Sequence, residues 1–377
     1  MKQYFYALAT FTGTIIGVGI FGLPYATAQI GFIPILFYFA FLGLITILIH
    51  LIFGEICLRT PGAHRLPGLA EIYLGKRIKW ISVFSNTIGL LGANLAYLIV
   101  GGSFLASFFA PIFAGPELAY ILIFYFSGAL IIYLGTKTIS ESEFFSLIIF
   151  FIILFFLFAK GSFNINLANL ATIDLKNLIL PYGVILFSLA GMSVIPEIKE
   201  ILGQKNRFLK NIIITGTIIP IFTYLIFIIL VLGVNGAQTS PDALNGLVNA
   251  LGQNIVGYGF LFGVITTFTS YLTIGITIKK IFWYDLNFSH FSAWIIACFT
   301  PLLLYLIGFN DFIKIIAFIG AVTIGIDGIT VFLIHQKAKK QGKVKPIYEI
   351  KLAKPIIYLI MAIFLAGVVV EIVNLQI

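Results

Sequence analysis

Charged residues are scarce in this sequence of 377 residues. Lys, Arg, Asp and Glu make up 10% of the chain and hydrophobic residues 60%, whereas a soluble domain carries about 25% charged residues. So few charges cannot cover the two or three soluble domains that a chain of this length would form. The composition therefore excludes an ordinary soluble protein and predicts an integral membrane protein.

Groups for catalysis and metal binding are also sparse. The four histidines have no metal-ligand spacing, and Cys57 and Cys298 lie in or beside apolar runs. The sequence contains no Walker loop and no Gly-x-Ser-x-Gly nucleophile elbow. Basic residues lie between apolar runs rather than on an aromatic-interleaved face, which argues against nucleic acid. We expect no enzyme, no organic cofactor, no nucleic-acid partner and no obligate protein partner.

Long apolar runs dominate what is present. A helix needs about 20 apolar residues to cross the hydrocarbon core, so runs bounded by charge, Pro or Asn predict membrane spans. The sequence predicts eleven spans: 5–29, 32–56, 78–106, 117–136, 144–160, 179–202, 211–233, 256–281, 290–307, 312–335 and 354–375. About a third of the chain lies outside these spans, too little for an appended soluble domain, so residues 1–377 are expected to form a single all-α membrane domain.

The basic residues predict how the spans are oriented. With the N-terminus in the cytoplasm, 20 of the 23 Lys and Arg residues lie inside, and only Lys160, Lys176 and Lys314 lie outside. The pattern predicts a multi-pass plasma-membrane protein with a cytoplasmic N-terminus and an extracytoplasmic C-terminus. Within the longest cytoplasmic loop, residues 59–77 predict a short amphipathic helix at the membrane surface.

The spans divide into two halves of similar length, 5–160 and 179–335, followed by an extra helix at 354–375. Because each half holds five spans, the halves enter the membrane from opposite sides, as in the inverted repeats of many secondary transporters. Gly17 and Gly191 are each the thirteenth residue of the first span in their half. The sequence therefore predicts two interruptions at matching depth.

Both glycines lie shortly before a proline, Pro24 and Pro196. Glycine weakens a helix and proline removes a donor, so a turn can unwind there. Within the membrane this is tolerated only where the backbone is buried or lines a cavity. Freed amides suit a carboxylate and freed carbonyls suit a cation. The alternative is that these glycines serve close helix packing; two matching breaks favour a binding site.

Three motifs carry a family resemblance. GTIIGVGIFGLPYA at 13–26, FGEICLRTPG at 53–62 and FSLAGMSVIPEI at 187–198 resemble the amino acid/auxin permease family. That family belongs to the amino acid–polyamine–organocation superfamily, which has the LeuT-type fold. The resemblance implies two inverted five-helix repeats with discontinuous helices 1 and 6, plus an eleventh helix. It also implies secondary active amino-acid transport by alternating access, driven by a sodium or proton gradient.

The resemblance also implies a substrate site. Amides around Gly17, Val18 and Gly19 would hold the carboxylate, and carbonyls from Phe187 to Gly191 the ammonium group. The helix that carries Asn94 and Tyr97 lines the pocket in this fold. The expected substrate-binding residues are Gly17, Val18, Gly19, Asn94, Tyr97, Phe187, Ala190, Gly191 and Ser193. The small residues beside Phe187 leave room for a large side chain, which favours a neutral or aromatic amino acid.

An ion site is expected next to this pocket. The resemblance implies carbonyls from Gly13 and Ile16 facing Thr266, Thr269 and Ser270, whose i, i+3, i+4 spacing puts them on one helix face. Oxygen ligands suit a hard cation, although such hydroxyls also serve helix packing. The inner half of the fifth span lacks the lysine of some proton-coupled relatives, which favours sodium. Sodium-coupled animal members carry Asn in place of Gly13, so both ions stay open.

Acidic residues within spans are functional candidates because burying them is costly. Glu197 and Asp327 are expected to couple or gate transport, with structural pairing as the alternative. Glu55 and Arg59 are spaced i, i+4 and predict an interfacial ion pair. For the protein as a whole, a channel or pore and a non-transporting membrane scaffold are the alternatives to a transporter.

Overall fold

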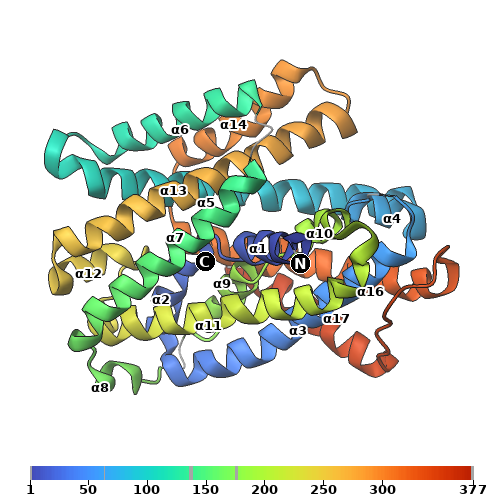
Figure 1. Ribbon diagram of the computed structural model, residues 1–377, viewed down its shortest axis with the longest axis horizontal. Coiled ribbons are helices and arrows are strands. Elements are labelled where there is room, and N and C mark those ends of the chain that lie inside the picture. Colours follow the sequence, from blue (N-terminus) through green and yellow to red (C-terminus); the bar gives the residue numbers. More distant parts are fainter. Residues whose placement is uncertain (1, 63, 136–138, 175–176, 375–377) are drawn as a thin grey trace.

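The computed structural model describes residues 2–62, 64–135, 139–174 and 177–374, and within these ranges every regular element is a helix (Figure 1). Each predicted span falls on one helix or on two consecutive helices. The helices are α1 (Lys2–Ile15) with α2 (Gly19–Ile30), α3 (Phe32–Arg59), α5 (Lys76–Phe113), α6 (Glu117–Leu134), α7 (Ile139–Gly161), α9 (Leu180–Ser188) with α10 (Ile195–Leu202), α11 (Leu209–Asn235), α13 (Gln253–Lys280), α14 (His290–Leu306), α15 (Phe312–Phe318) with α16 (Ile324–Gln341), and α17 (Lys354–Asn374).

Length and apolar composition identify membrane-spanning helices in the described residues. Eight are long and apolar enough, or up to nine when the bent pair α1 and α2 counts as one span. Helices α9 to α11 fall within one continuous stretch, Leu180–Gln238, and α14 is shorter than a full span. The all-helical membrane architecture is thus established, whereas the number of eleven spans stays a prediction. The predicted end of the eleventh span, residue 375, lies outside the described residues.

The helices form two packed groups. Helices α1, α2, α3, α9, α10 and α11 contact one another, and α5, α6, α13 and α14 form the second group. In Figure 1, α6 and α14 lie along one edge, while α3 and α11 lie along the other. Small residues allow close approach within the second group: Gly102 of α5 faces Ile121 of α6, and Gly263 of α13 faces Phe104 of α5.

Within the described residues, three of the predicted spans are interrupted between two helices. The axes of α1 and α2 differ by 47° across residues 16–18, and α9 ends at Ser188 before the 3₁₀ turn η2 (Met192–Val194) and α10. These breaks are at the two glycines that the sequence singles out. The third irregularity, the π-helical turn η6 (Ile319–Thr323) between α15 and α16, was not predicted. A π-helical turn contains one more residue than an α-helical turn, and such turns frequently occur at functional sites.

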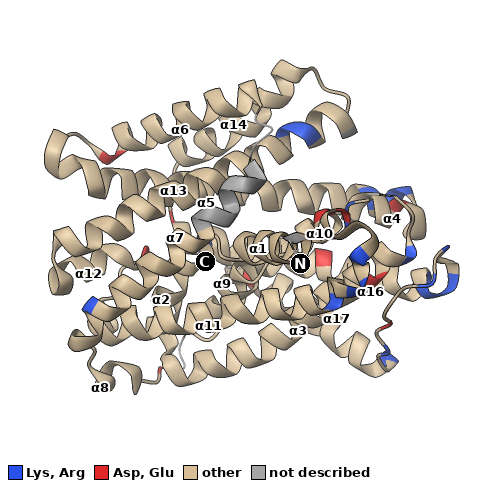
Figure 2. Cartoon of the chain, in the orientation of Figure 1, with Lys and Arg blue, Asp and Glu red and all other residues tan. Residues whose placement is uncertain are grey.

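Short helices and charges mark the two ends of the bundle. Helix α4 (Leu66–Leu74) confirms the helix expected within residues 59–77, and α12 (Leu244–Leu251) lies at the opposite end. Figure 2 shows that Lys and Arg gather at one end of the bundle, around α4 and the loops near α16. This charged end carries the residues that the positive-inside rule assigns to the cytoplasm.

Candidate functional site

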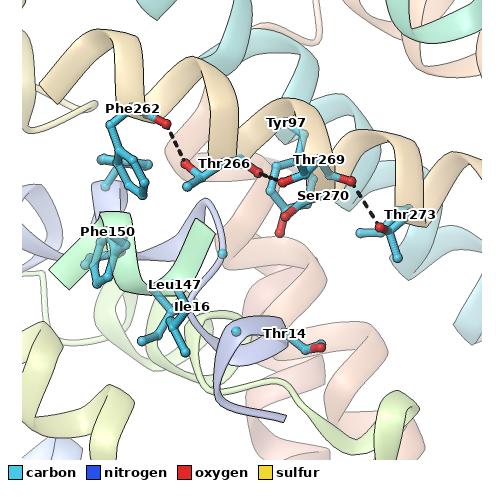
Figure 3. Close-up of a pocket in the computed structure, with 15 residues that line it drawn as sticks. Thr14, Ile16, Tyr97, Leu147, Phe150, Phe262, Thr266, Thr269, Ser270 and Thr273 are labelled. Atoms are coloured by element: carbon cyan, nitrogen blue, oxygen red, sulfur yellow. Dashed lines mark hydrogen bonds between the residues drawn. The ribbon is translucent and has the colours of Figure 1, made fainter. Parts of the chain in front are cut away.

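A cavity of about 110 Å³ borders the break between α1 and α2 (Figure 3). Helices α1, α2, α5, α7 and α13 contribute its walls. It is lined by Gly13, Thr14, Ile16, Gly17, Ile20, Phe21, Tyr97, Leu147, Phe150, Phe262, Thr266, Thr269, Ser270, Thr273 and Ile274. The lining residues that the structure describes carry no charge, and their polar atoms are hydroxyls and backbone groups. Such a cavity suits a ligand with a neutral side chain.

The first break places backbone amides beside a tyrosine hydroxyl. Gly17 packs directly against the Tyr97 hydroxyl, which a Cβ at this position would overlap. The amides of Ile20 and Phe21 turn back to the carbonyls of Gly17 and Val18. The amides just before them, at the start of α2, have no carbonyl one turn earlier in their own helix. They lie at the positive end of the α2 dipole, which favours an anionic group.

The second break is packed closed. The carbonyls of Phe187, Ser188 and Gly191 accept hydrogen bonds from the Ala190 amide (3.1 Å), the Tyr224 hydroxyl (2.8 Å) and the Val194 amide (3.4 Å), respectively. Gly191 lies against α1, because a Cβ there would come within 2.7 Å of an Ile15 side-chain carbon.

The structure therefore separates the expected substrate-binding residues. Gly17 and Tyr97 line the cavity, whereas Val18, Gly19, Phe187, Ala190, Gly191 and Ser193 are not among its lining residues. Gly19 packs against Ser188 of α9 instead, and Ser193 is exposed.

Tyr224 of α11 joins the two breaks and was missed by the sequence analysis. Its fully buried hydroxyl is 2.6 Å from the carbonyl oxygen of Ile15 and 2.8 Å from that of Ser188, the last residues of α1 and α9. One hydroxyl proton is thus shared between the two carbonyls that end the broken helices. The sequence pattern did not indicate a role for this single tyrosine in the apolar α11, because only the fold shows that it faces both breaks.

The expected ion ligands come together on one side of the cavity. Gly13 of α1 and Ile16 of the first break line the same cavity as Thr266, Thr269 and Ser270 of α13. The Thr266 hydroxyl donates to the Phe262 carbonyl at 3.1 Å, and the Thr269 hydroxyl to the Thr266 carbonyl at 3.0 Å. A hydroxyl that donates in this way keeps lone pairs for a cation. The donor set is neutral oxygen, which fits an alkali cation.

Asn94 lies away from the cavity. Its side chain is fully buried, and neither amide atom has a hydrogen-bond partner within the described structure. It points towards Gly275 of α13, whose Cβ position lies 3.6 Å from Nδ2. Asn94 therefore belongs to the packed interface between α5 and α13 in this conformation.

The acidic candidates lie towards the charged end of the bundle. Glu197 pairs with Arg65 at 3.0 Å, and both side chains are partly exposed. The predicted pair of Glu55 and Arg59 is confirmed at 2.8 Å, and His335 adds a 3.2 Å contact to Glu55. Asp327 lies on α16 and has no ion pair among the described residues. Neither Glu197 nor Asp327 lines the cavity.

Comparison with known proteins identifies the transporter class. A model of the tryptophan/tyrosine permease family matches residues 1–374. The chain belongs to the tryptophan/tyrosine permease family. This family is not the amino acid/auxin permease family that the motifs resemble, although both are amino-acid transporters. Membership makes the protein an amino-acid permease of the membrane and places it among transporters rather than enzymes.

Individual relatives agree with this assignment. The permease is 26% identical to "Tyrosine-specific transport system 1" of Haemophilus influenzae over 283 residues, which cover 70% of the permease and 69% of the relative. It is 28% identical to "Glutamine transporter 2" of Aliivibrio fischeri over 236 residues, 59% of the permease and 58% of the relative. These alignments therefore leave about a third or more of each relative unmatched.

A solved structure establishes the fold. The crystal structure of MhsT in complex with L-phenylalanine superposes with a TM-score of 0.72 at 14% sequence identity, covering 98% of the permease and 97% of MhsT. The LeuT-type fold that the sequence resemblance implies is confirmed. In this fold the permease places its first helix break, Tyr97 and the hydroxyl-bearing face of α13 around one cavity.

Proposed function

We propose that the permease moves a neutral amino acid with a large or aromatic side chain through the cavity at the first helix break. The observation that carries this proposal is the lining: Phe21, Phe150 and Phe262 lie around one cavity with Gly17 of the first break and Tyr97, and no charged residue lines it. An apolar wall with few polar atoms is typical of small-molecule sites. A tyrosine transport system among the relatives and a phenylalanine-bound structure with the same fold support an aromatic substrate.

The two ends of an amino acid need different partners. We assign the carboxylate to the amides of Val18 and Gly19 at the start of α2, next to the Tyr97 hydroxyl. The ammonium group is assigned to carbonyls at the second break, from Phe187 to Gly191. Because several of these carbonyls have internal partners here, the second break must rearrange before it can hold the ammonium group. Phe187, Ala190, Gly191 and Ser193 then belong to a substrate-bound conformation.

The driving ion is assigned to the cavity's oxygen atoms. Carbonyls of Gly13 and Ile16 together with hydroxyls of Thr266, Thr269 and Ser270 would hold sodium, which is carried along with the amino acid. A site without a carboxylate has only neutral ligands, so its affinity should be modest. It should also depend on the substrate carboxylate nearby, which adds a negative charge.

We assign this conformation to the inward-facing half of an alternating-access cycle. Phe21 packs edge-on against Phe104 at 4.8 Å, and Phe104 contacts Phe260 at 5.8 Å. These buried rings of α2, α5 and α13 lie towards the end of the bundle opposite to the charged residues. Thr273 and Leu147 extend the cavity towards the charged end instead. With that end in the cytoplasm, the N-terminus is cytoplasmic and the C-terminus extracytoplasmic in a bacterial plasma membrane.

The proposed organisation also includes the repeats. Residues 5–160 and 179–335 are assigned to the two inverted halves, and α17 (Lys354–Asn374) is the extra helix. The first helix of each half is the broken one, which is why both breaks meet at Tyr224. In the rocking of one helix group against the other, the group containing α1 and α9 would move as a unit.

Thermal stabilisation and uptake test this function. The purified permease is heated with each of the twenty amino acids, with and without sodium, and we expect the largest stabilisation from aromatic amino acids. The same substrate should be taken up by proteoliposomes with saturation and gradient dependence. Gly17→Leu should abolish uptake while the protein still folds, because its side chain fills the space of the Tyr97 hydroxyl. Unchanged uptake by this variant would refute the carboxylate site, and non-saturating flux would indicate a pore.

A further inference from the structure

Positive charge is concentrated in the loop between α16 and α17. Residues 337–354, called here the basic segment, contain seven lysines and one acid, Glu349. All seven lysines are exposed, and Figure 2 shows the blue Lys and Arg positions along this loop at the charged end of the bundle. Glu349 pairs with Arg59 of α3 at 2.9 Å, and none of the seven lysines forms an ion pair with a described residue. Lys339 donates to a backbone carbonyl, that of Ile350, at 2.7 Å. The basic segment therefore presents positive charge that the described residues do not neutralise.

The basic segment is fixed to the end of α3 at two points. The backbone amides of Lys343 and Val344 both donate to the Arg59 carbonyl at 3.2 Å. Further along the chain, the Ile350 amide donates to the Glu55 carboxylate at 2.6 Å. Because these bonds use backbone groups of the segment, they hold it in place without occupying its lysine side chains.

The contacts of Tyr348 indicate the depth at which the basic segment lies. The Tyr348 hydroxyl donates to the Leu51 carbonyl of α3 at 2.9 Å. Gly54 makes this approach possible, because a Cβ at that position would overlap the hydroxyl. Leu51 is five residues before the end of the predicted span 32–56, which is about 7.5 Å along a helix. The middle of the segment therefore lies level with the boundary between the hydrocarbon core and the headgroups.

Exposed apolar side chains lie among the lysines at this depth. Val344 and Ile347 flank Lys345 and Pro346, and they are 45% and 57% exposed. Basic and apolar side chains that are exposed together beside a membrane helix are typical of segments that bind an anionic membrane surface. The positive-inside rule accounts for the lysines, but it requires neither the exposed apolar residues nor the attachment to α3. The combination favours a lipid surface as the partner.

We propose that the basic segment binds the headgroups of anionic phospholipids at the charged end of the bundle. Its lysine ammonium groups pair with lipid phosphates, while Val344 and Ile347 reach the adjoining acyl chains. Through the bonds to Arg59 and Glu55, the bound lipids hold the end of α3, which packs on α9, α10 and α11. This surface is separate from the cavity at the first break, and lipid binding there does not depend on which solute is transported.

Thermal melting of the detergent-purified permease with added lipid tests this surface. Anionic phosphatidylglycerol should stabilise the parent protein more than zwitterionic phosphatidylcholine does, and high salt should reduce the difference. The double variant Lys343→Gln/Lys345→Gln should need about tenfold more phosphatidylglycerol for the same stabilisation. Lys76→Gln/Arg77→Gln removes two exposed charges at the start of α5 and should respond like the parent. Equal losses in both double variants, a parent protein without lipid preference, or equal stabilisation by soluble polyglutamate would overturn the proposal.

Photo-crosslinking to lipid keeps the proposal testable if the lysine variant fails to fold. An Ile347→Cys variant is labelled with a photoreactive thiol reagent, since Cys57 and Cys298 are buried, and placed in a bilayer of equal phosphatidylglycerol and phosphatidylcholine. We expect the crosslinked lipid to be enriched in phosphatidylglycerol relative to the bilayer. Asn310→Cys, at an exposed position between α14 and α15, should give the bilayer ratio. A bilayer ratio at Ile347 as well, or labelling of water alone there, would contradict the lipid-binding surface.

Discussion

The two broken helices of the permease share a sequence pattern but differ in surroundings. At the first break, Ile16 and Gly17 line a cavity that is bounded by Tyr97 and the hydroxyls of α13. At the second, the carbonyls of Phe187 and Ser188 have internal partners, and Gly191 packs on α1. A glycine that unwinds a membrane helix is therefore not sufficient for a ligand site. The neighbouring helices decide whether the freed backbone groups face a cavity or one another.

This difference suggests that the two breaks have different roles in transport. The first break borders the cavity, while the second contacts the Tyr224 hydroxyl on one side and, through α9, the π-helical turn η6 on the other. We therefore expect substitutions at the first break to affect binding and those at the second to affect the conformational step. The following variants test that separation in order of expected effect.

Gly19→Ala should have the largest effect. Its Cβ would lie 2.8 Å from the Ser188 Cα, and because that atom belongs to the backbone of the second break, the two broken helices would be forced apart. We expect uptake to be lost and the unfolding free energy to fall by about 3 kcal/mol, measured by thermal melting. Gly13→Ala is the matched control, because no atom lies within 4 Å of its Cβ position. Equal melting of the two variants would show that the breaks are not tightly packed.

Tyr224→Phe should weaken the connection between the breaks. It removes the hydroxyl that donates to the carbonyls of Ile15 and Ser188. Because these buried carbonyls then lose that hydrogen bond, the unfolding free energy should fall by about 2 kcal/mol. We expect the maximal uptake rate to change more than the substrate concentration at half-maximal rate. Tyr258→Phe, at an exposed tyrosine of α13, should behave like the parent protein. A variant with unchanged melting temperature and rate would show that the bridge is dispensable.

Thr269→Val should have a smaller effect, confined to the ion. The variant keeps the shape of the side chain but loses an oxygen that lines the cavity, so the sodium-dependent part of the thermal stabilisation should decrease. Thr277→Val removes an equivalent hydroxyl, bonded to the carbonyl four residues earlier, but away from the cavity lining. If both variants lose the same amount of the sodium response, Thr269 is a packing residue and the ion site lies elsewhere.

Glu197→Gln should have the smallest effect on stability. Its ion pair with Arg65 at 3.0 Å joins α10 to the segment before α4, and both side chains are partly exposed. Exposed pairs contribute about 0.2–1 kcal/mol, so the melting temperature should hardly change. We expect faster exchange if the pair restrains α10 during the conformational step. A melting shift as large as that of Tyr224→Phe would show that this pair is structural.

Much of the fold was accessible from the sequence because the membrane limits the choices. Long apolar runs must be helices in hydrocarbon, and the helices observed begin and end within a few residues of most predicted spans, such as Phe32–Arg59 for 32–56. The break positions were accessible too, because Gly17 and Gly191 weaken their helices locally. The i, i+3, i+4 spacing also placed Thr266, Thr269 and Ser270 on one face, and the structure brings them to one cavity.

The remaining features depended on contacts between distant segments. Asn94 and Tyr97 are spaced i, i+3 and lie on neighbouring positions of one helix face. Only Tyr97 reaches the cavity, because Asn94 packs against Gly275 of α13. The π-helical turn η6 carries no glycine or proline pattern that distinguishes it from other spans. Tyr224 lies 209 residues from Ile15 in the chain, so its role is invisible until α1, α9 and α11 pack together.

The sequence by itself determined a membrane protein of apolar helices, their approximate bounds, the concentration of positive charge at one end and the two positions where helices unwind. These follow from local composition and from the cost of unpaired backbone groups in hydrocarbon. Only the tertiary structure decided that the first break opens on a cavity while the carbonyls of the second have internal partners such as the Tyr224 hydroxyl. Those outcomes depend on which helix faces pack together, and packing is set by the shapes of residues far apart in the chain.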